Sequence, residues 1–130
     1  MEQFELKETF TVKPSVIYNA WLDSDEHAEM TGGDASITSQ EGTSYTAWDG
    51  YITGSNISLI PNQKIVQTWR TVEFMPDDED SKLTIVLQEI EEGCELTLIH
   101  ENIPTGQTQY EQGWVDNYFI PMKQFFASLA

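Results

Sequence analysis

The last part of the chain, residues 109–126, carries an apolar stripe that constrains the fold more than any other feature. Tyr110, Trp114, Tyr118 and Met122 follow one another at four-residue intervals, which places them on one face of an α-helix. More apolar residues widen this face (Val115, Phe119, Phe125, Phe126), and polar residues fall mostly opposite (Gln112, Asp116, Asn117, Lys123, Gln124). So large an aromatic face needs a concave partner to cover it. The sequence therefore predicts a long C-terminal helix lying across a curved sheet.

Pro121 stands inside this predicted helix. Because proline has no N–H, the helical hydrogen bond to the carbonyl of Asn117 is lost. We therefore expect a kink at this point of the helix.

The rest of the chain shows the period of β-strands, apart from two short helical segments. We expect a first strand at residues 4–10, a helix opened by Pro14, and a second helix that runs to about Met30. Alternation or β-branched residues then predict strands near 35–40, 45–48, 51–60, 65–72, 83–87 and 94–101, with Asp49-Gly50 as a hairpin turn and Gly54 as a candidate bulge. The short connections favour an antiparallel sheet. The predicted class is α+β: a curved antiparallel sheet wrapped around the C-terminal helix, with two short helices after the first strand.

Length and charge limit the classes of function. A chain of 130 residues is expected to form one domain, residues 1–130, with a sizeable core. The formal net charge of −16 argues against nucleic acids and anionic membranes as partners. A basic protein surface would be attracted to such a chain, although acidity alone often serves solubility.

Cys94 is the single cysteine, so no disulfide within the chain is expected, and a strand position favours a buried thiol. The first residues lack the basic and apolar regions of a signal peptide, and no apolar run approaches membrane-spanning length. We therefore expect a cytoplasmic protein.

Several segments together resemble one family, the activator of heat-shock-protein-90 ATPase homologues, within the START-like (Bet v-like, polyketide cyclase) superfamily. The segments are residues 16–22 (VIYNAWL), 31–33 (TGG), 47–54 (AWDGYITG), 65–70 (IVQTWR), and Gly113-Trp114 with Tyr118 and 121–123 (PMK). They cover nearly the whole chain in order. The resemblance implies the helix-grip fold, which agrees with the fold expected from periodicity.

The resemblance also implies two directions for function. The eukaryotic namesake is a two-domain co-chaperone whose C-terminal half, of this domain type, contacts the ATPase end of the chaperone. A separate N-terminal domain contacts the middle of the chaperone, and these 130 residues have no room for it. The wider superfamily binds lipids, steroids and other apolar molecules, so fold alone does not decide the function.

Aromatic residues are the main candidates for a ligand site. If a cavity lies between sheet and helix, we expect Trp48, Tyr51, Trp69, Trp114 and Tyr118 to line it. The alternative is that these rings fill an ordinary core, because large aromatics dominate cores whether or not a cavity exists.

Two polar residues complete the predicted site. Arg70 follows an aromatic residue near a strand end, where it could hold a ligand carboxylate or pair with a surface acid such as Glu73. His100 alternates with Leu96 and Leu98, so an inward orientation would place it at the cavity as a ligand contact or an acid–base group. A hydrogen-bonded structural histidine is the alternative.

Signals for metals, cofactors and catalysis are weak. His27 lies in a short acidic helix and is expected to be exposed, and neither histidine has a second ligand at metal spacing. The sequence contains no nucleophile elbow, phosphate-binding loop or dinucleotide fingerprint, so we predict no metal site and no cofactor. The acidic run 77–80 is interpreted as a solvated loop.

Three hypotheses follow. The first is a non-enzymatic binding protein whose cavity takes a small apolar or aromatic molecule. The second is a partner of the heat-shock protein 90 chaperone that uses its acidic surface. The third is a cyclase-like or aromatase-like enzyme that uses a cluster of His100, Arg70 and Tyr51. The sequence does not determine the oligomeric state.

Overall fold

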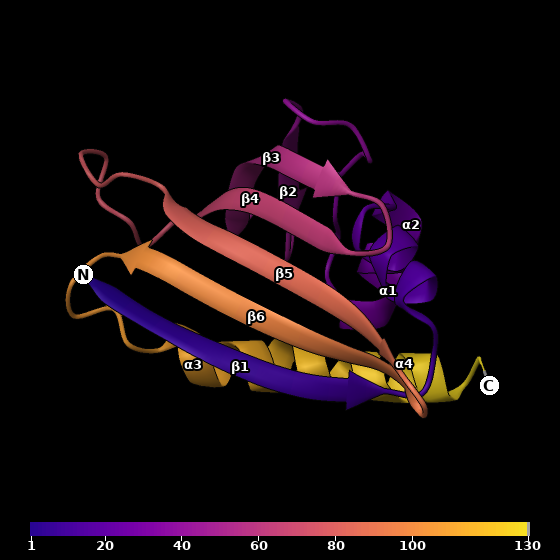
Figure 1. Cartoon of the computed structure of the whole chain (residues 1–130). Coiled ribbons are helices and arrows are strands. Elements are labelled where there is room, and N and C mark those ends of the chain that lie inside the picture. The colour runs from indigo at the N-terminus through magenta and orange to yellow at the C-terminus, as the bar shows by residue number, and fades with distance from the viewer. Residues whose placement is uncertain (130) are drawn as a thin grey trace.

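One antiparallel sheet of six strands forms the frame of the molecule (Figure 1). The structure is a computed structural model that describes residues 1–129, so Ala130 lies outside the described residues. The strands are β1 (Glu2–Phe10), β2 (Ser44–Ala47), β3 (Ile52–Ile60), β4 (Lys64–Thr71), β5 (Ser81–Ile90) and β6 (Gly93–Ile103), in the order β1-β6-β5-β4-β3-β2. Two short helices, α1 (Pro14–Trp21) and α2 (Ser24–Thr31), follow β1.

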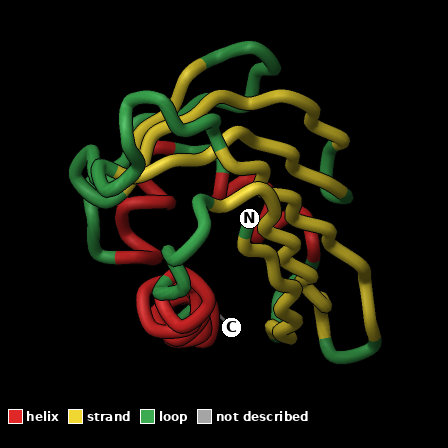
Figure 2. Tube along the Cα trace, turned by 90° about the vertical axis from the view of Figure 1, so that its left-hand side faces the viewer, coloured by secondary structure: helices red, strands yellow, loops and turns green. Residues whose placement is uncertain are grey.

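The sheet curls over the C-terminal helix, as the end-on view in Figure 2 shows. This helix consists of α3 (Tyr110–Trp114), a π-helical segment Val115–Phe119, and α4 (Ile120–Ala127). The predicted fold class and the helix-grip arrangement are therefore confirmed, including the two short helices after the first strand.

The apolar stripe of the C-terminal helix is buried against the concave face of the sheet. Tyr110, Trp114, Tyr118 and Met122 are all buried, and Phe126 continues the stripe in α4. The polar residues predicted for the opposite side are exposed (Gln112, Asp116, Asn117, Lys123, Gln124). Burial of these large side chains is the main term that holds the helix on the sheet, at about 1.5–3 kcal/mol for each one.

The helix accommodates Pro121 by a wider turn before it. The N–H of Ile120 donates to the carbonyl of Val115, five residues earlier, within the π-helical segment. The helix then continues through Pro121 as α4 (Figure 1). A π turn relaxes the four-residue bonding pattern that proline would otherwise break, and our expectation of a simple kink missed it.

Two predictions within the sheet need correction. The stretch 35–40 forms only an isolated bridge, Ser36 to Thr46, because the backbone N–H and C=O of Ile37 both bond the Ser24 hydroxyl. The register shift of β3 lies after Asn56 and not at Gly54. Gly54 instead permits close contact, since a Cβ atom there would lie 1.9 Å from the carbonyl oxygen of Thr68.

Among the helices of residues 1–129, none combines the length and the hydropathy that a membrane crossing requires.

Candidate functional site

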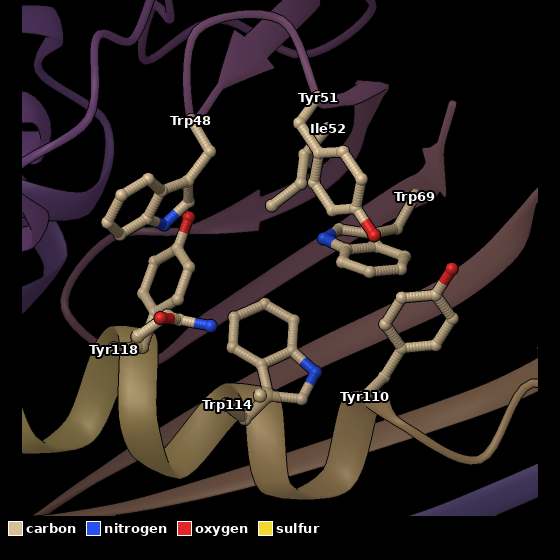
Figure 3. A pocket seen from close by; sticks show the side chains of 9 residues that line it. Trp48, Tyr51, Ile52, Trp69, Tyr110, Trp114 and Tyr118 are labelled. Atoms are coloured by element: carbon tan, nitrogen blue, oxygen red, sulfur yellow. The ribbon is translucent and has the colours of Figure 1, made fainter. Parts of the chain in front are cut away.

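A pocket of about 400 Å³ lies between the C-terminal helix and one end of the β2–β3–β4 part of the sheet. Figure 3 shows side chains from the sheet facing side chains from the helix across this space. The lining residues are Trp48, Tyr51, Ile52, Trp69, Tyr110, Gly113, Trp114, Asn117 and Tyr118. The pocket reaches the surface, since Asn117 is exposed and Trp48 and Tyr51 are half-buried.

The helix supplies the floor of the pocket. Tyr110, Trp114 and Tyr118 lie one turn apart along it, and Gly113 and Asn117 form the neighbouring row. A Cβ atom built on Gly113 would meet only Asn117 Nδ2, at 3.9 Å. The missing side chain at Gly113 therefore contributes directly to the open space.

The hairpin turn between β2 and β3 supplies the opposite wall. Ala47 pairs with Ile52, which confirms the hairpin predicted at Asp49-Gly50. Trp48 and Asp49 both adopt left-handed backbone conformations, with φ of 50° and 60°. Such conformations are unfavourable for a bulky residue and persist only where the surroundings hold them.

The loop after α2 holds this turn. Asp34 N–H donates to Asp49 Oδ1 at 3.0 Å, and Asp49 N–H donates to the Asp34 carbonyl at 3.1 Å. Gly33 lies against the indole of Trp48 so closely that a Cβ atom there would be 2.5 Å from its Cε3. Two segments that carried the family resemblance, 31–33 and 47–54, thus meet to position Trp48 at the pocket.

His100 lies behind the pocket and does not line it. Its Nδ1 accepts from Trp114 Nε1–H at 3.0 Å, and its Nε2–H donates to the Ser81 hydroxyl at 2.9 Å. The Ser81 hydroxyl in turn donates to the carbonyl of Trp69. Burial lowers the pKa of His100 to about 3. The ring is therefore neutral and satisfied at both nitrogens. It holds the Trp114 indole directly and the Trp69 backbone through Ser81.

His27 is buried, with 2% of its surface exposed, which contradicts the expectation of an exposed residue. Its Nδ1–H donates to the Trp21 carbonyl at 2.8 Å, and its Nε2 accepts from the Tyr118 hydroxyl at 2.9 Å. Burial lowers the pKa of His27, and it also raises the pKa of Tyr118. The hydrogen bond between His27 and Tyr118 thus connects one end of the pocket floor to α2.

Arg70 also lies away from the pocket. Its guanidinium pairs with Asp80 at 2.8 Å and donates to the carbonyls of Met75 and Asp78. The expected partner Glu73 instead accepts from the Tyr51 hydroxyl at the pocket rim. Arg70 thus organises the acidic loop 75–80 and does not present a free cation to a ligand.

Of the seven residues predicted for the site, the structure brings five together around the pocket (Trp48, Tyr51, Trp69, Trp114, Tyr118). Whether they bind a ligand stays a prediction. Sequence reasoning missed Tyr110, Gly113, Asn117 and Ile52 as lining residues. The four-residue repeat that contains Trp114 and Tyr118 also contains Tyr110, so the same spacing could have predicted Tyr110 as a lining residue.

The nine lining residues include no carboxylate, ammonium, guanidinium or imidazole group. Within residues 1–129, the Trp48 indole N–H is buried without a hydrogen-bond partner. The pocket is therefore suited to neutral, mainly apolar molecules, because a bare charge would lose its hydration without gaining a counter-charge.

Comparison with known families assigns the chain. A family model described as Activator of Hsp90 ATPase homolog 1-like protein matches residues 11–127. The chain belongs to this family.

Named relatives agree with this assignment. A Dictyostelium discoideum protein described as Activator of 90 kDa heat shock protein ATPase homolog is 30% identical over 127 residues, which are 95% of this chain and 32% of that protein. The human Activator of 90 kDa heat shock protein ATPase homolog 1 is 27% identical over 122 residues, 93% of this chain and 36% of that protein. The chain thus spans about a third of the length of these relatives.

Solved structures share the fold. An HSP90 activator from Plasmodium falciparum superposes with a TM-score of 0.88 and 23% identity, covering 98% of this chain and 97% of that one. A Mesorhizobium loti protein has a TM-score of 0.86 and 16% identity, covering 99% of both chains.

We expect Gly113→Ala to stabilise the protein. The added methyl group enters open space, and alanine is favoured over glycine inside a helix by about 1 kcal/mol. Urea unfolding measures the change. Gly54→Ala is the contrasting control and should destabilise strongly, because its Cβ would collide with the Thr68 carbonyl and with Tyr45. A loss of stability in Gly113→Ala would contradict the open space at this position.

The two buried histidines predict that stability falls in mild acid. Both pKa values are lowered in the folded state, whereas an unfolded histidine titrates near 6.5, so the unfolded chain binds more protons below that pH. Between pH 7.5 and 5.5 the free energy of unfolding should fall by about 1 kcal/mol because of His100, whose folded pKa is about 3, and His27 should add to this decrease.

Urea titrations at several pH values test this dependence. His27→Gln and His100→Gln serve as controls, and each should make the decrease smaller, by about 1 kcal/mol for His100→Gln. A free energy of unfolding that does not change over this range would show that the rings are accessible to protons in the fold.

Proposed function

We propose that this protein binds a heat-shock protein 90 chaperone and modulates its ATPase. The observation that carries the proposal is the family match, which covers residues 11–127 and so every helix and strand except β1. The relatives named as ATPase activators are about three times as long as this chain, and the match lies within about a third of their length.

The surface chemistry supports a protein partner with basic residues. The net charge is −16, and the loop 75–80 places Asp77, Glu79 and Asp80 in solvent. Exposed Val72 and Met75 lie in the same connection between β4 and β5, where they could add apolar contact. Acidic groups beside exposed apolar ones favour a partner surface that is basic around an apolar centre.

The experiment measures binding to the full-length chaperone of the same cell and the ATPase rate of that chaperone. We expect binding that weakens by about tenfold when salt is raised from low to physiological strength, since the attraction is electrostatic. The double variant Asp77→Asn with Glu79→Gln should weaken binding in the same way.

A matched control lies at the opposite end of β5. Glu91→Gln with Glu92→Gln removes the same charge from the exposed β5–β6 turn and should have the smaller effect. Binding that is absent at low salt, or that ignores both salt and the loop variant, would contradict the proposal.

We also infer a second function from the pocket: it binds a small, neutral, mainly apolar molecule. The supporting observation is a space of about 400 Å³ with aromatic walls and no ionic group among its nine lining residues. The pocket and the proposed chaperone-binding loop are neighbours, because the Val72 N–H donates to the carbonyl of Tyr51, which lines the pocket.

A neutral fluorescent probe, N-phenyl-1-naphthylamine, tests this inference. Gly113→Leu should abolish probe binding, because the side chain fills the pocket from its floor. Gln112→Leu adds the same group on the exposed side of the helix and should leave binding unchanged. Equal binding by both variants would place the probe elsewhere.

The enzymatic alternative receives no support from the predicted cluster. His100, Arg70 and Tyr51 do not converge, since His100 bonds Ser81 and Trp114 while Arg70 bonds the acidic loop.

A further inference from the structure

The first strand, β1, forms one edge of the sheet along its full nine residues. It pairs with β6 on one side only, and it runs along the lower edge of the sheet in Figure 1. The opposite edge is β2, which has four residues and is partly covered by the bridge from Ser36 to Thr46. The two edges therefore differ, and β1 is the long one.

The backbone groups on the outer side of β1 point away from β6. Thr9 N–H donates to the carboxylate of Glu8 and not to β6. Because successive residues of a strand point their N–H and C=O groups to alternate sides, Glu5 and Lys7 share the outward orientation of Thr9. Long edge strands usually carry charged side chains, a proline, a bulge or a cover that prevents pairing. The strand β1 has charged side chains and a register shift between Glu2 and Phe4, but residues 4–10 contain no proline and keep an unbroken register with β6.

We propose that two copies of this protein pair through their β1 strands, antiparallel about a twofold axis at Leu6. In this register Glu5 of each copy lies opposite Lys7 of the other, and both residues have outward backbone groups. The two neighbouring registers would instead place Glu5 opposite Glu5, or Lys7 opposite Lys7. Opposite charges stabilise a cross-strand pair and like charges destabilise it, so the charges select the Leu6-centred register.

The other face of β1 gives this pairing an apolar component. Phe4 and Leu6 pack against the core but stay half-buried. In the twofold arrangement the two Leu6 side chains meet at the axis, and the strand of the second copy covers part of each Phe4. An exposed strand edge with a partly exposed apolar face is the combination that strand addition uses for recognition.

The net charge of the protein determines how the affinity of the dimer changes with salt concentration. Each copy carries a charge of −16, so the copies repel one another at long range, while the Glu5–Lys7 pairs act at short range. Salt therefore strengthens this dimer, whereas it weakens the proposed binding to a chaperone. The two proposals can fail independently.

Sedimentation equilibrium over a wide range of protein concentration, at low and high salt, tests the proposal. We expect a monomer–dimer equilibrium that shifts towards dimer as salt is added. Lys7→Glu should weaken the dimer by about tenfold, because both attractive pairs become repulsive. The exchange Glu5→Lys with Lys7→Glu restores opposite charges and should restore the dimer.

Lys82→Glu is the matched control. It makes the same change of charge at an exposed position on β5, two strands from the edge, and should leave the dimer affinity close to that of the unchanged protein. A chain that stays monomeric at every concentration and salt would overturn the proposal. So would a dimer that Lys7→Glu leaves intact, or one that the double exchange fails to restore.

Discussion

The packing of Trp114 against the concave sheet is the contact on which the rest of the structure depends. Its indole stacks near Trp21 with ring centres 6.1 Å apart, lies 5.7 Å from Trp69, and donates its N–H to His100. Helix α1, strand β4, strand β6 and the C-terminal helix therefore meet at one side chain. Aromatic pairs of this kind add about 0.5–1.5 kcal/mol each beyond the burial of their area.

This arrangement also explains why a pocket exists in so aromatic a core. Large rings that are fixed from behind cannot relax into neighbouring space. His100 and Ser81 fix Trp114 and the Trp69 backbone, and His27 fixes Tyr118. With these rings held and no side chain at Gly113, the remaining volume stays open. The polar contacts behind the rings therefore keep the rings from moving into the pocket and filling it, as side chains do in an ordinary packed core.

Much of the fold and part of the site could be predicted from the sequence, because both depend on periodicity. The helix at residues 110–127 and the hairpin at Asp49-Gly50 follow from spacing and turn chemistry that are local in the chain. The aromatic residues on the helical side of the pocket, Trp114 and Tyr118, follow from the same spacing.

Other features depend on partners that are distant in sequence. His27 stands among acidic residues, and only the fold brings Tyr118, 91 positions later, to its ring. Arg70 pairs with Asp80 because the loop 75–80 folds back towards it. The backbone conformation of Trp48 is held by its contact with Gly33 and by the hydrogen bonds between Asp34 and Asp49. Local pattern carries no information about such contacts.

The π-helical turn has a consequence for the phase of the C-terminal helix. Five buried residues follow one another at intervals of four, from Tyr110 to Phe126. In a regular α-helix each such step overshoots a full turn by about 40°, so the last residue would have rotated far from the first. The wider turn at 115–119 absorbs part of this overshoot and returns Met122 and Phe126 to the sheet. The number of residues between Trp114 and Met122 therefore matters as much as their polarity. Deleting one residue there would turn Met122 and Phe126 away from the sheet, whereas exchanging one apolar side chain for another would keep them facing it.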